Sequence, residues 1–179
     1  IAIGCNLIQR NTHLETRTMM DGKTKSQVIV DENGKIVGME GPLFREICWD
    51  PVRKTLRTYK REKVRDEDPD TVCNVVDKLW PQLRVLARCK PNDKLVLVRG
   101  MQESQRYMLK RSGDPTYKND VNINMMPEVC AVTGDGTNDA PAISEAEVGF
   151  AMGIEGTQIA QDASDIILTT DNFCSIVSA

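Results

Sequence analysis

Short apolar runs alternate with helical patterns along the second half of the chain. The run "LRVLA" (83–87) predicts a buried strand, and Pro91 is expected to open a helix through "NDKLVLVRGMQ". Further strands are predicted at "EVCAVT" (128–133), "VGFAM" and "DIILT", with helices over 141–146, near "GTQIAQDA" and after Asn172. Strands that alternate with short helices imply a parallel sheet covered on both faces. The expected fold class is therefore α/β, with a doubly wound parallel sheet.

The first half has a weaker pattern, and residues 9–76 are expected to be largely an insertion on this core. Within them, "QVIVDENGKIVGM" predicts a hairpin with Asn33 and Gly34 at the turn. Residues 49–69 are rich in charge and lack periodicity, so they are expected to be mobile and dispensable for folding of the core. The polar stretch "KRSGDPTYKNDVNIN" predicts a long loop between a helix and a strand.

Composition narrows the class of protein. A chain of 179 residues with 40% hydrophobic content suffices for one ordinary core, so one domain is expected. The net charge of -3 and the pI near 5.3 predict no nucleic-acid partner, and no apolar run is long enough to span a bilayer. Six cysteines without a C-x-x-C pair favour reduced thiols in a cytosolic setting. The opening "IAIGCNLIQR" lacks a signal-peptide pattern and suggests a chain that begins in mid-domain.

The loop "VTGDGTNDAP" holds the first candidate chemistry. Asp135 comes two residues after the predicted strand, and ligands of open parallel sheets bind beyond the carboxyl ends of the strands. Gly134 and Gly136 allow the backbone to approach a bound group, while Asn138 and Asp139 precede a helix start. Carboxylate oxygens there suit Mg²⁺. The alternative is that Asp135 and Asp139 are only turn and N-cap residues.

Lys94 is the second candidate. It lies near the start of the helix that follows "LRVLA", so we expect it to meet Asp135 at the same edge of the sheet. A cation in that position could neutralise a transferring phosphoryl group. The alternative is an exposed helix lysine with no such role.

The order of these motifs carries a resemblance to a known family. "RVLARCKPNDK" followed by "VTGDGTNDAPAISEAEVGFAMGIEGTQIAQDASDIIL" resembles the P-type cation-transporting ATPases, in the later part of their phosphorylation domain. "LWPQLRVLAR" and "SDIILTTDNFCSIV" are similar to calcium pumps of the plasma-membrane type. The resemblance covers residues 1–8, weakly 39–45, and 79–179. It implies a haloacid-dehalogenase-like (Rossmann-like) fold, here incomplete, with inserted hairpin and loop segments, and a partial phosphorylation domain over 1–179.

The resemblance also implies roles for residues at matching positions. Asp135 resembles the family's Mg²⁺ carboxylate and Lys94 its phosphate-facing lysine, with Asn138 and Asp139 ordering the site around an aspartyl phosphate. Asp139 is also a candidate metal ligand, and the candidate cofactor contacts are Thr133, Gly134 and Gly136. The implied cofactor is Mg²⁺ with ATP as phosphoryl donor, and the implied partners are a transported cation, calcium by resemblance alone, and the remainder of the pump. The implied location is the cytoplasmic portion of an integral protein of the plasma membrane or an internal membrane, held there through transmembrane helices that this sequence does not contain.

Two departures from the family pattern affect these expectations. Ile143-Ser144-Glu145 replaces the more usual Leu-Lys-Lys, which removes basic side chains after the loop. The family's nucleophile motif Asp-Lys-Thr-Gly-Thr is absent from the sequence, and no Thr-Gly-Asp precedes the one at 133–135, although the family has an earlier copy. The chain is therefore predicted to be a piece of a pump that is inactive alone.

Two alternative functions remain open. One is a fragment of a soluble haloacid-dehalogenase-like phosphatase, which would carry an Asp-x-Asp nucleophile motif in the preceding sequence. The other is a non-catalytic interaction module, favoured if the complete gene encoded only these residues. A preceding Asp-Lys-Thr-Gly-Thr with apolar segments of about 20 residues would indicate the pump.

Overall fold

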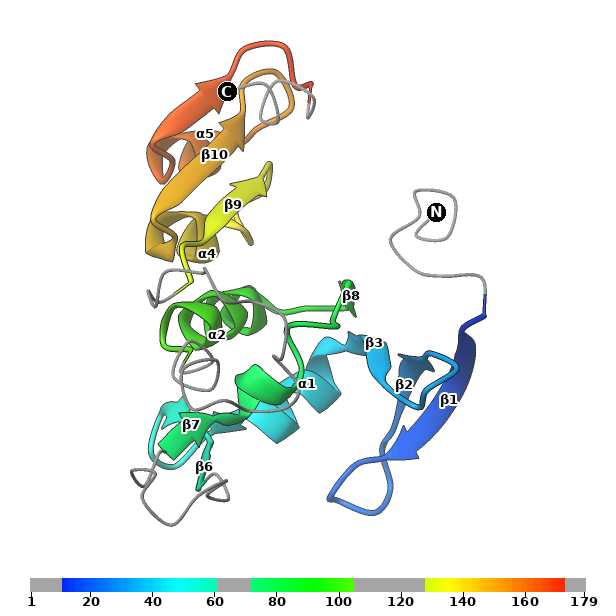
Figure 1. Ribbon diagram of the computed structural model, residues 1–179. Helices are drawn as coiled ribbons and strands as arrows, with labels where there is room; N and C mark the ends of the chain where they lie inside the picture. The colour runs from blue at the N-terminus through cyan, green and yellow to red at the C-terminus, as the bar shows by residue number, and fades with distance from the viewer. Residues whose placement is uncertain (1–10, 61–71, 105–127, 173–179) are drawn as a thin grey trace, which may run out of the picture.

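The computed structural model describes residues 11–60, 72–104 and 128–172. The two larger β-sheets of these ranges lie apart, with the helices α1 (Gly41–Cys48) and α2 (Pro91–Gln102) between them (Figure 1). None of the helices in these ranges combines the length and apolar character needed to cross a membrane. The opening stretch 1–10, the predicted long loop over 110–124 and the predicted closing helix after Asn172 lie outside the described residues.

The first sheet contains the predicted hairpin. Its strand order is β1-β2-β3-β8, in which the first three strands pair antiparallel and β3 pairs parallel with β8. The hairpin turns at Gly34, whose φ is 75°, and the Asp31 carboxylate accepts hydrogen bonds from the backbone N–H groups of Asn33 (2.9 Å) and Lys35 (2.8 Å). The prediction of a hairpin at this position is confirmed. The strands are β1 (His13–Thr18), β2 (Lys25–Val30), β3 (Ile36–Glu40) and β8 (Val85–Ala87).

The position of β8 corrects the expected architecture. One continuous parallel sheet from Leu83 onward was the prediction, and the strand itself is present, but it pairs with β3 through Gly38 opposite Val85. The hairpin is therefore part of the sheet that contains β8, and the later strands form a second sheet. An apolar run predicts that a strand forms, but it carries no information about which strand supplies its hydrogen-bond partners.

The largest hydrophobic core lies between this sheet and the helices. Alternate residues of β2 point into it, because successive strand side chains face opposite sides of a sheet. Phe44 of α1 is fully buried there, and Val96 brings α2 into the same cluster. That residues 9–76 are an insertion stays a prediction, but residues of this segment supply most of the core. The buried members are Val28, Val30, Met39, Leu43, Phe44, Cys48, Val76, Leu79 and Val96.

The charge-rich segment has more regular structure than its composition predicts. Residues 49–60 form short strands, and Trp49 and Leu56 pack against the main core. The expectation of mobility stays a prediction for these residues, and residues 61–69 lie outside the described ranges. The strands pair as two short antiparallel ladders, followed by a 3₁₀ turn. These elements are β4 (Trp49–Asp50), β5 (Thr55–Leu56), β6 (Thr58–Lys60), β7 (Val72–Asn74) and η1 (Val75–Lys78).

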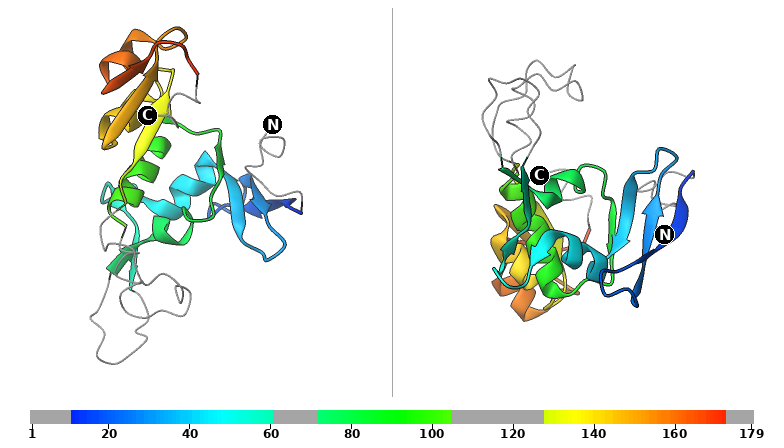
Figure 2. Two further views of the ribbon diagram at one scale, coloured as in Figure 1. Left: turned by 45° about the horizontal axis from the view of Figure 1, so that its top comes forward. Right: turned by 90° about the horizontal axis from the view of Figure 1, so that it is seen from below.

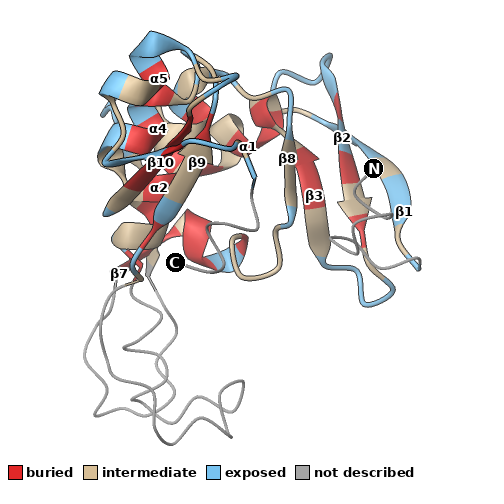
Figure 3. Ribbon diagram, turned by 90° about the horizontal axis from the view of Figure 1, so that it is seen from above, coloured by how far each residue is buried: buried red, intermediate tan, exposed pale blue. Residues whose placement is uncertain are grey.

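The second sheet is parallel, as predicted, with the strand order β11-β10-β9. Ala151 of β10 packs with the helices α4 and α5, which contact one another and lie on one face of the sheet. Phe150 and Met152 point the other way and are also buried, so β10 is covered on both faces (Figure 3). Figure 2 shows the sheet and its helices from two further directions. The elements are β9 (Ala131–Gly134), α4 (Ala140–Glu145), β10 (Val148–Met152), α5 (Gln158–Asp162) and β11 (Ile166–Leu168).

The fold is thus mixed α/β, with parallel strands in both sheets. This is consistent with a Rossmann-like arrangement. Helices cover one face of the second sheet within the described ranges, so the doubly wound and haloacid-dehalogenase-like descriptions stay predictions.

The cysteines in the described ranges fit the expectation of reduced thiols. Four of them are free: Cys48, Cys73, Cys89 and Cys130. Burial raises the pKa of the Cys48 thiol to about 12, so this group stays protonated and unreactive at neutral pH.

Candidate functional site

The acidic loop lies between the end of β9 and the start of α4. Gly134 ends the strand in close contact with Asp139, since a Cβ added to Gly134 would lie 2.4 Å from the Asp139 Cβ and 2.8 Å from its Cγ. No other residue type leaves room for Asp139 in this position. Gly136 is less constrained, because its added Cβ would lie 3.6 Å from the nearest Asp139 oxygen.

The Asp139 carboxylate is held inside the loop. Its Oδ2 accepts a hydrogen bond from the backbone N–H of Gly136 at 3.3 Å, and its Oδ1 contacts the Lys94 ammonium. The side chain is 14% exposed. Asp139 occupies the N-cap position of α4, yet its side chain makes no capping hydrogen bond to that helix. The structure therefore uses this carboxylate as the partner of Lys94 and not as a helix cap.

Lys94 reaches the loop from α2. The Lys94–Asp139 ion pair joins residues that are 45 positions apart, and the Lys94 side chain is 39% exposed. α2 packs against α4 through Val98 and Ala142, which fixes the distance between the two helices. The predicted meeting of Lys94 with the acidic loop is thus observed, but its partner there is Asp139, where Asp135 was expected.

Asp135 and Asn138 are exposed, and Thr133 is half-buried on β9. Within the described ranges, the Asp135 carboxylate makes no hydrogen bond or ion pair, while its backbone carbonyl accepts a hydrogen bond from Thr157 at 2.8 Å. In the same ranges no three His, Cys, Asp or Glu side chains gather into a metal-binding group. A free, exposed carboxylate still fits Mg²⁺, which takes one or two protein carboxylates and completes its shell with phosphate oxygens and water. Because the Asp139 carboxylate is already paired with Lys94, Asp135 is the better candidate for a Mg²⁺ ligand of the two.

Sequence reasoning missed a second ion pair beside the loop. Arg99 of α2 donates two hydrogen bonds to Glu145 of α4, from Nε at 2.8 Å and from an Nη at 3.1 Å. The bond from Arg99 lowers the pKa of the Glu145 carboxyl below its ordinary value. The only available signal was the departure of Glu145 from the family's usual lysine, because a carboxylate at this helix position can attract a cation from a neighbouring element.

The close approach of Gly134 to Asp139 makes a testable prediction. Gly134→Ala is expected to destabilise the chain by about 1–3 kcal/mol, because the new methyl group forces Asp139 away from its position. Urea denaturation followed by circular dichroism measures the change. Gly136→Ala is the matched control and should leave stability within about 0.5 kcal/mol. Equal effects of the two substitutions would contradict the packing described for Gly134.

Sequence comparison confirms the predicted resemblance. A segment of 117 residues, 65% of this chain, is 48% identical to plasma membrane calcium-transporting ATPase 1 of Homo sapiens. The identity is also 48% to plasma membrane calcium-transporting ATPase mca-1 of Caenorhabditis elegans, over 118 residues and 66% of the chain. In each case the aligned segment spans 8% of the relative's length, so this chain corresponds to a small part of each relative. No family model matches the chain.

Proposed function

We propose that this chain, a relative of the plasma membrane calcium-transporting ATPases over about two thirds of its length, forms part of the phosphorylation domain of an ATP-driven calcium pump. The observation that carries the proposal is the meeting of Lys94 with the acidic loop. A lysine and an aspartate from distant parts of the chain converge beside an unpaired carboxylate, just beyond the carboxyl end of a parallel strand.

In this proposal Lys94 places a positive charge beside the phosphoryl group during transfer. Phosphoryl transfer spreads negative charge over the equatorial oxygens, so a positioned ammonium lowers the free energy of the transition state. Asp139 holds that ammonium in place, and Gly134 allows Asp139 to lie close to the strand end. Asn138 orders the exposed side of the loop, where the phosphorylated side chain from elsewhere in the pump would enter.

Asp135 is the residue of this chain that would hold Mg²⁺. When bound, this ion neutralises charge on the phosphate oxygens and orients them. Thr133, Gly134 and Gly136 then shape the backbone around the bound phosphate. The Thr157 hydrogen bond to the Asp135 carbonyl connects this loop to the start of α5, which limits movement of the loop backbone.

The similarity to calcium pumps supports this proposal over the two alternatives. A soluble phosphatase and a non-catalytic module could both contain a loop of this shape, since a fold does not determine a function. A match of 48% identity over a segment that includes about two thirds of the chain favours the pump.

The purified 179-residue chain tests the assignment of roles. Incubated with Mg²⁺ and labelled ATP and then quenched in acid, it should carry no label, because the acceptor aspartate motif is absent from its sequence. The intact protein should form a calcium-dependent phosphoenzyme that hydroxylamine cleaves, as it cleaves acyl phosphates. Stoichiometric, hydroxylamine-sensitive label on the chain alone would show that it contains its own acceptor. An intact protein whose phosphoenzyme ignores calcium would overturn the choice of ion.

A further inference from the structure

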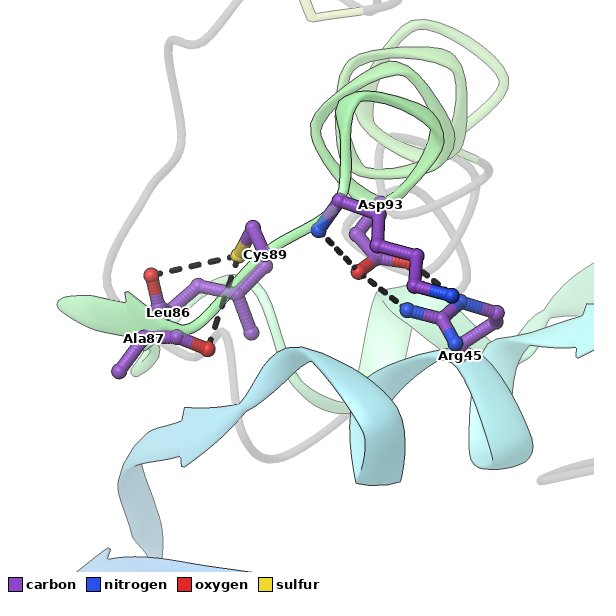
Figure 4. A network of polar contacts seen from close by, with 6 residues as sticks. Arg45, Leu86, Ala87, Cys89 and Asp93 are labelled. Carbon is purple, nitrogen blue, oxygen red and sulfur yellow. Dashed lines mark hydrogen bonds and ion pairs between the residues drawn. The ribbon is translucent and has the colours of Figure 1, made fainter. Parts of the chain in front are cut away.

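Asp93 is a fully buried carboxylate in the first turn of α2, directly before Lys94 (Figure 4). Its Oδ1 accepts a hydrogen bond from Nε of Arg45 at 2.7 Å, and its Oδ2 accepts one from an Nη of Arg45 at 2.7 Å. Oδ2 also accepts from the backbone N–H of Lys90 at 2.8 Å. A buried carboxylate is costly unless its lone pairs are used, and these three bonds use them.

The bond between Arg45 and Asp93 joins two helices that contact one another. Arg45 comes from α1, and a Cβ added to Gly41 at the start of α1 would lie 2.7 Å from the Asp93 Oδ2 and 3.0 Å from the Cα of Cys89. The bond to Asp93 raises the pKa of the Arg45 guanidinium, so Arg45 keeps its positive charge in this pair. α1 therefore determines where the first turn of α2 lies.

Lys94 follows Asp93 in that same turn. The first N–H groups of a helix have no partner inside the helix, so a first turn without a side-chain cap frays. Here Asp93 accepts the N–H of Lys90, and Arg45 fixes Asp93 from outside the helix. The backbone from which the Lys94 side chain extends is thus held at two points.

We propose that Arg45 is a positioning residue, which holds Asp93 and through it places the Lys94 ammonium against Asp139. This role rests on the proposed function only for its consequence in phosphoryl transfer. The positioning of Lys94 by Arg45 can be measured in the 179-residue chain alone. It gives a role in the site to α1, which lies within the segment that the sequence predicts to be an insertion.

Competitive acetylation of lysines, read by mass spectrometry, tests the placement of Lys94. In Arg45→Met the acetylation rate of Lys94, relative to exposed Lys25, should rise about fivefold to tenfold, because the ammonium loses its fixed partner. Arg45→Lys should give a smaller rise, since it keeps the charge but not the two parallel hydrogen bonds. Arg53→Met is the matched control, because Arg53 is 81% exposed, and it should leave the Lys94 rate unchanged.

Alkylation of fully buried Cys48 reports whether each variant remains folded. Protected Cys48 with an unchanged Lys94 rate in Arg45→Met would overturn the proposal. If Arg45→Met exposes Cys48, the milder Arg45→Lys decides: a rise at Lys94 with Cys48 protected supports the role, and no rise overturns it. A different result would show that the proposed function is wrong: the intact protein with Lys94→Ala would form phosphoenzyme at the normal rate.

Discussion

Lys94→Ala in the intact protein is expected to lower the rate of phosphoenzyme formation on the order of 100-fold or more, while the protein remains folded. The substitution removes the charge that faces the phosphoryl group and leaves Asp139 without its ion-pair partner. Asp135→Asn should have an effect of similar size, because an amide is a poor ligand for Mg²⁺. Rapid-quench measurement of acid-stable label from ATP gives the rate directly.

The matched controls remove the same kinds of group from exposed positions. Lys25→Ala removes a lysine on β2, and Asp162→Asn changes a carboxylate on α5. Both variants should form phosphoenzyme at the rate of the unmodified protein. A loss in the controls equal to that in the site variants would mean that the effect comes from net charge and not from the site.

Phe44→Ala should destabilise the 179-residue chain by about 3–5 kcal/mol, the cost of removing a large side chain from a core that cannot fully collapse. Phe44 is fully buried in the main cluster, where it packs between the first sheet and α2. Urea denaturation followed by circular dichroism measures the free energy of unfolding. Since many domains of this size are stable by only about 5–15 kcal/mol, the variant should lose a large part of its total stability.

Leu14→Ala provides the comparison for that variant. Leu14 lies on β1 of the same sheet but is 60% exposed, so its truncation should cost less than about 1 kcal/mol. A cost for Phe44→Ala no larger than that for Leu14→Ala would mean that α1 is not part of the stabilising core. It would also support the expectation that residues 9–76 are an insertion on the core.

The sequence predicted the elements of the second sheet well, because each of them has a local signature. β10 coincides with the apolar run "VGFAM", and Pro141 lies in the first turn of α4. The hairpin turn was equally local, since Gly34 supplies the positive φ that the turn requires. Such features depend on a few neighbouring residues and can be inferred without knowledge of the tertiary structure.

Features that depend on distant partners could not be inferred. The pairing of β8 with β3 depends on two strands separated by α1 and the charge-rich segment. Asp93 resembles an ordinary acidic residue in the first turn of a helix, and nothing in the sequence indicates that Arg45 would bury it. Whether Lys94 pairs with Asp135 or with Asp139 likewise depends on the geometry of side chains that are 45 positions apart in the sequence.

The two arginine pairs at either end of α2 have a consequence for local unfolding. Arg45–Asp93 joins the first turn of α2 to α1, and Arg99–Glu145 joins its last turns to α4. A helix held in this way cannot fray from either end without breaking an inter-helix ion pair. We therefore expect its amide protons to exchange with solvent in a single opening event shared with α1 and α4, as they would if these three helices form one cooperative unit of the native state.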